Sequence, residues 1–62
     1  MEGNNKYEGT PNVDVVLVLQ SFGWKAYECT TNYKSFISKC EMQGKSVRYI
    51  GRTNNEGVLF YE

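Results

Sequence analysis

The chain has 62 residues, of which 40% are hydrophobic and 15% aromatic, and its seven lysines and arginines balance seven aspartates and glutamates. This length allows one domain, and a chain so short buries only about 60% of the surface that its unfolded form exposes, so its stability is marginal without an oligomer or a covalent link. The apolar content argues against a disordered chain, zero net charge argues against binding to nucleic acid through a basic surface, and no segment approaches the ~18 apolar residues of a membrane-spanning helix.

The chain begins with a polar segment. Residues 1–12 are rich in glycine and asparagine and contain the single proline, so they are predicted to be a flexible leader before one α+β domain over residues 13–62. This segment lacks the apolar core of a signal peptide, so a cytoplasmic protein is expected. In that compartment Cys29 and Cys40 are expected as reduced thiols. Two cysteines without a histidine fall short of a zinc site, so no metal and no cofactor are predicted.

A β-hairpin is predicted next. Residues 13–20 are rich in β-branched side chains and too short for a buried helix, which favours a strand. The sequence SFGW then turns the chain, because Gly23 can adopt a positive φ angle. Residues 25–30 return as the second strand.

A helix of three turns follows the hairpin. Thr31 or Asn32 can cap its first free amides. Apolar side chains then recur at helical spacing, at Tyr33, Phe36, Ile37 and Cys40. Gly44 is expected to end the helix, and Lys39 and Lys45 suit the negative end of its dipole.

Two further strands complete the predicted fold. The sequence SVRYIGRT alternates like a strand, NNEG is a turn, and VLFYE is a short closing strand. The order is β-β-α-β-β, which predicts a small antiparallel sheet with one helix on one face.

The first strand carries more aliphatic side chains than one helix can cover. Residues 13, 15, 17 and 19 should point to one face, whereas Val16 and Val18 should point to the other. A contiguous apolar sheet face usually marks a protein interface. We therefore predict a homodimer that forms through the sheet, with Val16, Val18 and Tyr27 at its interface.

No catalytic constellation is present, so an enzyme is not expected. The chain has no histidine, and Cys40 is best interpreted as a small apolar residue on the helix stripe. An alternative function is binding of single-stranded nucleic acid through aromatic side chains and arginines, chiefly Arg48, Tyr49 and Arg52. Because Arg48 and Tyr49 are adjacent in a strand, they should lie on opposite faces, and nucleic acid is not the expected partner.

The segment from Asp14 to Cys29 resembles the small uracil-DNA glycosylase inhibitor of phi29-like Bacillus phages. The matching pieces cover about half of the chain: Asp14-Val15, Leu19-Gln20, Gly23, Lys25, Tyr27-Glu28, and a helix beginning near Tyr33. The resemblance implies a homodimer in the host cell cytoplasm that occupies the DNA-binding groove of the repair enzyme. There it would mimic DNA in part, with carboxylates in place of phosphates, and enclose, in an apolar pocket at the dimer seam, the leucine that the enzyme pushes into the minor groove.

The resemblance also implies which residues contact the enzyme. Phe36, in the sequence KSF, matches a phenylalanine near the start of the family's helix, and Glu28 matches an acidic residue of the second strand. Further along the helix, Ile37 and Cys40 stand where the family has acidic and tyrosine residues, and Glu41 is a substitute. The predicted partner-binding residues are therefore Tyr27, Glu28, Phe36, Cys40 and Glu41. One departure is charge, because a DNA mimic should be acidic and this chain is neutral.

Overall fold

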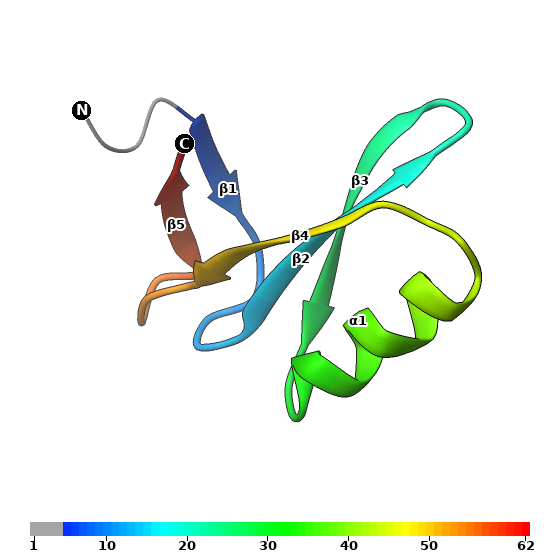
Figure 1. The fold of residues 1–62 in the computed structure, drawn as a ribbon. Coiled ribbons are helices and arrows are strands. Elements are labelled where there is room, and N and C mark those ends of the chain that lie inside the picture. Colours follow the sequence, from blue (N-terminus) through cyan, green and yellow to red (C-terminus); the bar gives the residue numbers. More distant parts are fainter. Residues whose placement is uncertain (1–4) are drawn as a thin grey trace.

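The computed structural model describes residues 5–62, which form two antiparallel sheets and one helix (Figure 1). The elements follow in the order β1 (Asn5–Glu8), β2 (Asp14–Gln20), β3 (Gly23–Cys29), α1 (Tyr33–Met42), β4 (Val47–Arg52) and β5 (Val58–Tyr61). One sheet has the strand order β3-β2-β4, and the other, the β1–β5 ribbon, pairs the first strand with the last. The predicted α+β class is confirmed, but the chain has a fifth strand and a second sheet that the sequence did not predict.

The central hairpin forms as predicted. β2 pairs with β3 from Asp14 opposite Cys29 to Gln20 opposite Gly23, and Gly23 closes the turn with a φ of 122°. That angle lies in a region where side chains with a Cβ are strained, so the glycine is required there. The hairpin thereby fixes which side chains of β2 and β3 share a face.

Helix α1 begins and ends with local hydrogen bonds. The Asn32 side chain accepts bonds from the amides of Lys34 (3.1 Å) and Ser35 (3.4 Å), which identifies Asn32 as the N-cap. At the other end Gly44, with a φ of 78°, donates its amide to the Glu41 carbonyl, and Lys45 donates to the Cys40 carbonyl. This pair of bonds is a Schellman motif, and it turns the chain back toward the sheet.

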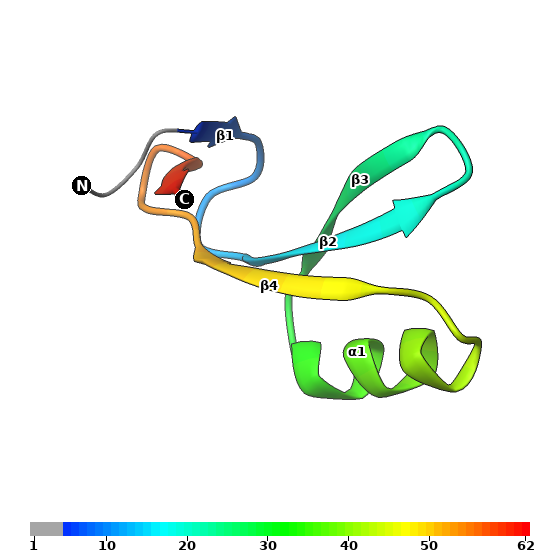
Figure 2. The same cartoon turned by 45° about the horizontal axis from the view of Figure 1, so that its top comes forward.

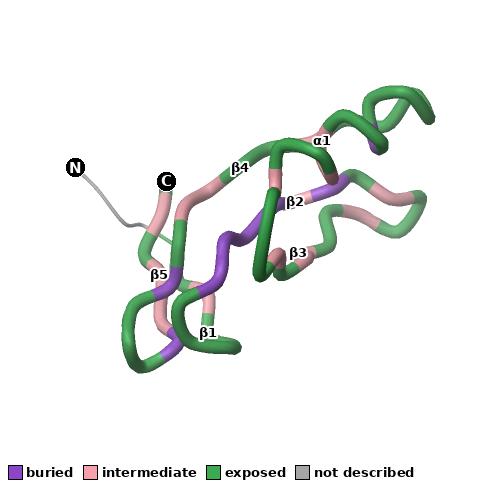
Figure 3. Tube along the Cα trace, turned by 90° about the horizontal axis from the view of Figure 1, so that it is seen from below, coloured by how far each residue is buried: buried purple, intermediate pink, exposed green. Residues whose placement is uncertain are grey.

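The three-stranded sheet lies between α1 and the β1–β5 ribbon (Figure 2). On the helix side, Val16, Val18 and Cys40 form a buried cluster, against which the partly buried side chains of Tyr27, Cys29, Tyr33, Phe36, Ile37 and Val47 pack. On the other side Val15 is fully buried, and its partner across the strands, Gly51, lies against the Leu59 side chain of β5. Burial therefore follows β2 through the middle of the molecule (Figure 3).

The leader predicted over residues 1–12 is wrong for residues 5–12, while residues 1–4 lie outside the described part. β1 pairs with β5 from Asn5 opposite Tyr61 to Glu8 opposite Val58. The following turn is held by the buried Thr53 side chain, whose hydroxyl donates to the Thr10 carbonyl (2.7 Å) and accepts from the Val13 amide (2.9 Å). This segment belongs to the folded domain because its partners lie at the far end of the chain.

The dimer interface predicted from Val16 and Val18 needs correction. Both side chains face α1 and are 0% and 1% exposed, so neither offers surface to a second copy. On the other face of the sheet, the part of β2 and β3 that the β1–β5 ribbon does not cover is exposed. There the cross-strand pair Leu19 and Trp24 is 42% and 52% exposed, and Leu17 lies next to it, partly buried. We call these three residues the open sheet patch.

Helix α1 has ten residues. Within residues 5–62, no helix is long and apolar enough to cross a membrane.

Candidate binding pocket

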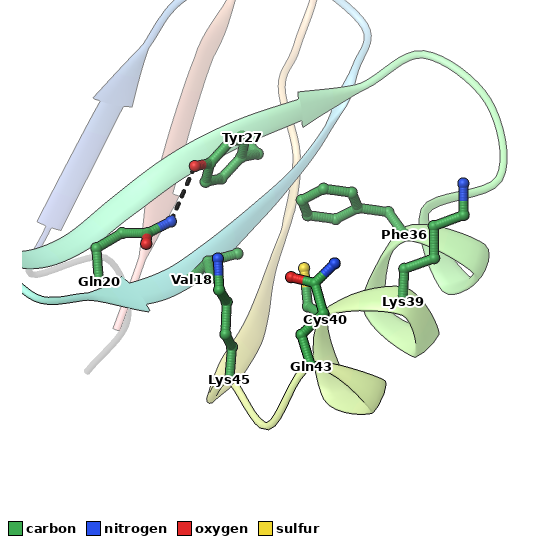
Figure 4. A pocket seen from close by; sticks show the side chains of 8 residues that line it. All are labelled: Val18, Gln20, Tyr27, Phe36, Lys39, Cys40, Gln43 and Lys45. Atoms are coloured by element: carbon green, nitrogen blue, oxygen red, sulfur yellow. Dashed lines mark hydrogen bonds between the residues drawn. The ribbon is translucent and has the colours of Figure 1, made fainter.

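A pocket of about 180 Å³ lies between helix α1 and the β2–β3 hairpin (Figure 4). Three elements supply its walls, and the lining side chains are Val18, Gln20, Tyr27, Phe36, Lys39, Cys40, Gln43 and Lys45. An engineered apolar cavity of about 150 Å³ is large enough to hold benzene. The pocket therefore has room for one aliphatic or aromatic side chain.

Local structure explains why these residues meet. Phe36, Lys39 and Cys40 of α1 and its C-cap Gln43 share one helical face, because the last three follow Phe36 by three, four and seven residues. The Schellman motif then returns Lys45 beside Cys40, since the Lys45 amide bonds to the Cys40 carbonyl at 3.0 Å. The helix period and its C-terminal cap together build one wall.

Aromatic side chains and the core form the floor of the pocket. The rings of Tyr27 and Phe36 pack with centroids 5.4 Å apart and planes tilted by 42°, and the buried Val18 and Cys40 lie beside them. The Gln20 amide nitrogen donates to the Tyr27 hydroxyl at 2.9 Å, which satisfies the phenol and fixes the ring (Figure 4). The floor is therefore apolar and ordered, as is typical of a site that takes an apolar group.

Three of the five predicted partner-binding residues come together in this pocket. Tyr27, Phe36 and Cys40 all line it, although they were assigned by different arguments. The helix stripe and the family resemblance interpret Phe36 differently, and the structure shows that it packs against the core and also lines the pocket.

Glu28 lies elsewhere and is already bound within the chain. It follows Tyr27 in β3, so its side chain points to the opposite face of the sheet. One carboxylate oxygen accepts from the Tyr7 hydroxyl (2.6 Å) and the Thr10 amide (2.8 Å), and the other accepts from the Thr10 hydroxyl (2.8 Å). The Tyr7 bond, then those from Thr10, lower the pKa of Glu28. Glu28 thus fastens the β1–β5 ribbon to β3.

Glu41 is not brought to the pocket either. It is exposed on α1 and is absent from the lining, whereas its neighbour Cys40 is buried there. The two predicted acidic contacts therefore do not gather around the apolar site. What surrounds the site instead is basic, because Lys39 and Lys45 stand at its edge.

The residues of the nucleic-acid alternative do not form one stacking surface. The Tyr49 ring stacks on Tyr33 with centroids 4.1 Å apart, and its hydroxyl donates to Asp14 at 2.9 Å. Burial and this bond raise the pKa of Tyr49 to about 12. Arg52 pairs with the same Asp14 at 3.3 Å, while Arg48 donates to the Glu62 carbonyl. Each of the three residues is therefore engaged by a partner within the chain, and Arg48 lies on the opposite face of the sheet from Tyr49.

The cysteines and acidic residues offer no reactive cluster in the part of the chain that the structure describes. No group of three metal-binding side chains occurs among residues 5–62. Both cysteines are free, and burial, followed by the charge of Asp14, raises the pKa of Cys29. A raised pKa keeps the group as a thiol, which is a poor nucleophile and metal ligand.

Sequence reasoning missed four of the polar lining residues, namely Gln20, Lys39, Gln43 and Lys45. A signal was available for two of them, because Lys39 and Gln43 lie three and seven residues after Phe36. Strand alternation places Gln20 on the face of Val16 and Val18, but its contact with Tyr27 depends on the register of β2 against β3.

Comparisons with protein-family models, with curated proteins and with solved structures give no match to this chain.

Proposed function

We propose that this protein is a non-enzymatic inhibitor that binds another protein by enclosing one of its apolar side chains in the pocket. The observation that carries this proposal is the pocket itself, whose floor of Tyr27, Phe36 and Cys40 remains open in a chain with few buried side chains. So small a protein gains stability from every apolar contact. An apolar recess left unfilled next to the core is consistent with selection for binding.

The target that we propose is host uracil-DNA glycosylase, on the strength of the family resemblance in residues 14–29. The recess has the size that a leucine side chain requires, and enclosing the leucine that enters DNA would block the enzyme's groove. The proposal assigns affinity to this apolar contact and not to phosphate mimicry, because Glu28 is occupied by Tyr7 and Thr10. The protein would act in the cytoplasm of the host cell.

The proposal includes a homodimer, formed through the open sheet patch. Leu17, Leu19 and Trp24 leave apolar surface on the face opposite the pocket, so dimerisation would not cover the site. Trp24→Lys should convert a dimer to a monomer in sedimentation velocity, because it places a charge in the apolar contact. Met42→Lys, at an 87% exposed helix position, is the matched control. A wild-type protein that sediments as a monomer at all concentrations would refute the dimer.

The test of function is a uracil-excision assay with bacterial uracil-DNA glycosylase and single-stranded DNA that contains uracil. Wild-type protein should abolish cleavage when present in slight excess over enzyme. Gln43→Trp should relieve inhibition, because Gln43 is exposed at the pocket mouth and an indole there fills the recess without disturbing the core. Met42→Trp adds the same ring one residue earlier, outside the lining, and should inhibit like wild type.

Phe36→Ala supplies a second comparison. It should weaken inhibition by more than the fall in melting temperature accounts for, since Phe36 lines the pocket in addition to packing against Tyr27. Full glycosylase activity in excess wild-type protein would reject the enzyme as target. Equal inhibition by Gln43→Trp and Met42→Trp would reject the pocket as the binding site.

A further inference from the structure

The edge of the pocket carries a concentration of positive charge. Lys39 of α1 and Lys45 of the following loop line the pocket directly. Lys25 of β3 adds a third ammonium group, which lies 5.5 Å from the centroid of the Tyr27 ring in the pocket floor. We call these three residues the lysine rim. They come from three segments of the chain: Lys39 and Lys45 line the opening itself, and Lys25 lies over the Tyr27 ring next to it.

The lysine rim has no acidic partner within residues 5–62. The ion pairs there join Lys6 to Glu8 and Arg52 to Asp14, and both involve other residues than the rim. No carboxylate lines the pocket. Glu41 lies two positions from Lys39 on the helix, a spacing at which side chains do not face each other. Among residues 5–62, no carboxylate therefore pairs with these lysines, and the negative end of the α1 dipole offsets their charge only in part.

An apolar floor below unpaired cations selects a particular kind of ligand. An aliphatic side chain gains free energy from the floor, and anions beside it gain from the ammonium groups, whose field is strengthened next to low-dielectric walls. Cations beside the aliphatic group would be repelled. The two features lie within one opening, so a single short segment of chain can satisfy both.

We propose that the pocket binds a protein segment in which one large aliphatic side chain is flanked by aspartate or glutamate. This inference rests on the proposed function, in which an apolar side chain of a partner enters the pocket. What it adds is that the residues on either side of that side chain are acidic. On a DNA-repair enzyme, the contact would then require carboxylates next to the protruding leucine. Cations of the groove that contact phosphates would be repelled by the lysine rim, so the inference restricts the proposed target to an enzyme with carboxylates next to that leucine.

The experiment uses three capped pentapeptides and isotope-labelled protein in NMR titrations. The first peptide has a central leucine with two acidic residues on each side, the second replaces the leucine with serine, and the third replaces the acidic residues with lysines. The first should shift the amide signals of Tyr27, Phe36 and Cys40. Its affinity should exceed that of each of the others by about tenfold or more, which corresponds to about 1.4 kcal/mol. High salt should reduce the difference between the acidic and basic leucine peptides.

Variants of the lysine rim test the charges. The double variant Lys39→Gln/Lys45→Gln removes both charges but keeps polar, flexible side chains, and it should weaken binding of the acidic leucine peptide by about tenfold. Both lysines are exposed, so the variant should fold, and far-UV circular dichroism checks this. Lys34→Gln, on the same helix but outside the pocket lining, should bind like wild type.

Four results would overturn the inference. Equal binding of the acidic and basic leucine peptides would show that the lysine rim does not select its ligand. Equal binding of the leucine and serine peptides would reduce the site to unspecific ion attraction. Signal changes confined to other residues would place the ligand elsewhere. Tighter binding of a thymidine oligonucleotide at the same signals would assign the site to nucleic acid.

The inference and the proposed function fail separately. If the acidic leucine peptide binds the pocket but the glycosylase stays active, the ligand chemistry stands and the target is wrong. If the glycosylase is inhibited equally by wild type and by Lys39→Gln/Lys45→Gln, and the peptides do not discriminate, the function stands and the lysine rim plays no part in it.

Discussion

The burial of Val16 gives a quantitative test of which face of β2 belongs to the core. Its side chain is 0% exposed and packs in the cluster below α1. Val16→Ala removes two methyl groups, which costs about 1.5 kcal/mol in transfer free energy and about 2–3 kcal/mol once the remaining cavity is included. For a domain of this size the melting temperature should fall by about 10–20 °C.

The assay is urea unfolding followed by far-UV circular dichroism at two well-separated protein concentrations. Leu19→Ala, at a 42% exposed position in the open sheet patch, should lose less than half as much free energy of unfolding at the lower concentration, where no second copy covers it. The loss from Val16→Ala should be the same at both concentrations, because a contact inside one chain does not depend on a second copy. A Leu19→Ala loss at the lower concentration as large as that of Val16→Ala, or a Val16→Ala loss that changes with concentration, would refute this assignment of the two faces.

Three further predictions concern the attachment of the β1–β5 ribbon. Gly57→Ala should destabilise the protein strongly, since Gly57 has a φ of 78° and an added Cβ would collide with the Gly9 carbonyl; an unchanged urea midpoint would contradict this. Glu28→Gln should lower the free energy of unfolding at neutral pH and remove part of its dependence on acid pH. The folded state lowers the pKa of Glu28. The contribution of this carboxylate to stability is therefore present above the unfolded pKa and is lost as pH falls through the folded pKa. Tyr7→Phe should flatten the stability profile at alkaline pH, because burial and Glu28 raise the pKa of Tyr7 to about 12, so its contribution is complete below about pH 10 and is lost as pH rises toward 12. Unfolding curves across pH measure both effects, and parallel wild-type and mutant profiles would contradict them.

The parts of the fold that the sequence predicts well depend on neighbours along the chain. The helix carries its own start at Asn32 and its own end at Gly44, and the hairpin carries its own turn at Gly23. β1 has no such signal, because its four residues form a strand only through pairing with β5 and through the bond from Tyr7 to Glu28. Without that second sheet, the burial of Val15 could not be foreseen.

The candidate site was predictable in its apolar half. The helical stripe and the resemblance together led to Phe36, Cys40 and Tyr27, which share one pocket. The basic half was missed because lysines on a helix are usually solvated, and only the three-dimensional arrangement brings Lys39 and Lys45 to the same opening. The resemblance assigned Glu28 to a partner, and its bonds to residues 7 and 10 could not be foreseen because they connect segments that the sequence does not link.

The ribbon also has a consequence for the order in which the protein folds. Glu8 pairs with Val58, so this ladder encloses residues 9–57, whereas the β2–β3 hairpin joins strands that follow one another directly, and the β2–β4 ladder encloses the shorter segment from Val18 to Val47. Closing a long loop costs more entropy than closing a short one. This entropy is lost before the contacts that compensate for it have formed. We expect the β2–β3 hairpin and α1 to assemble first and the ribbon to dock last. In the native protein the ribbon amides should then exchange with solvent through openings that leave the pocket intact.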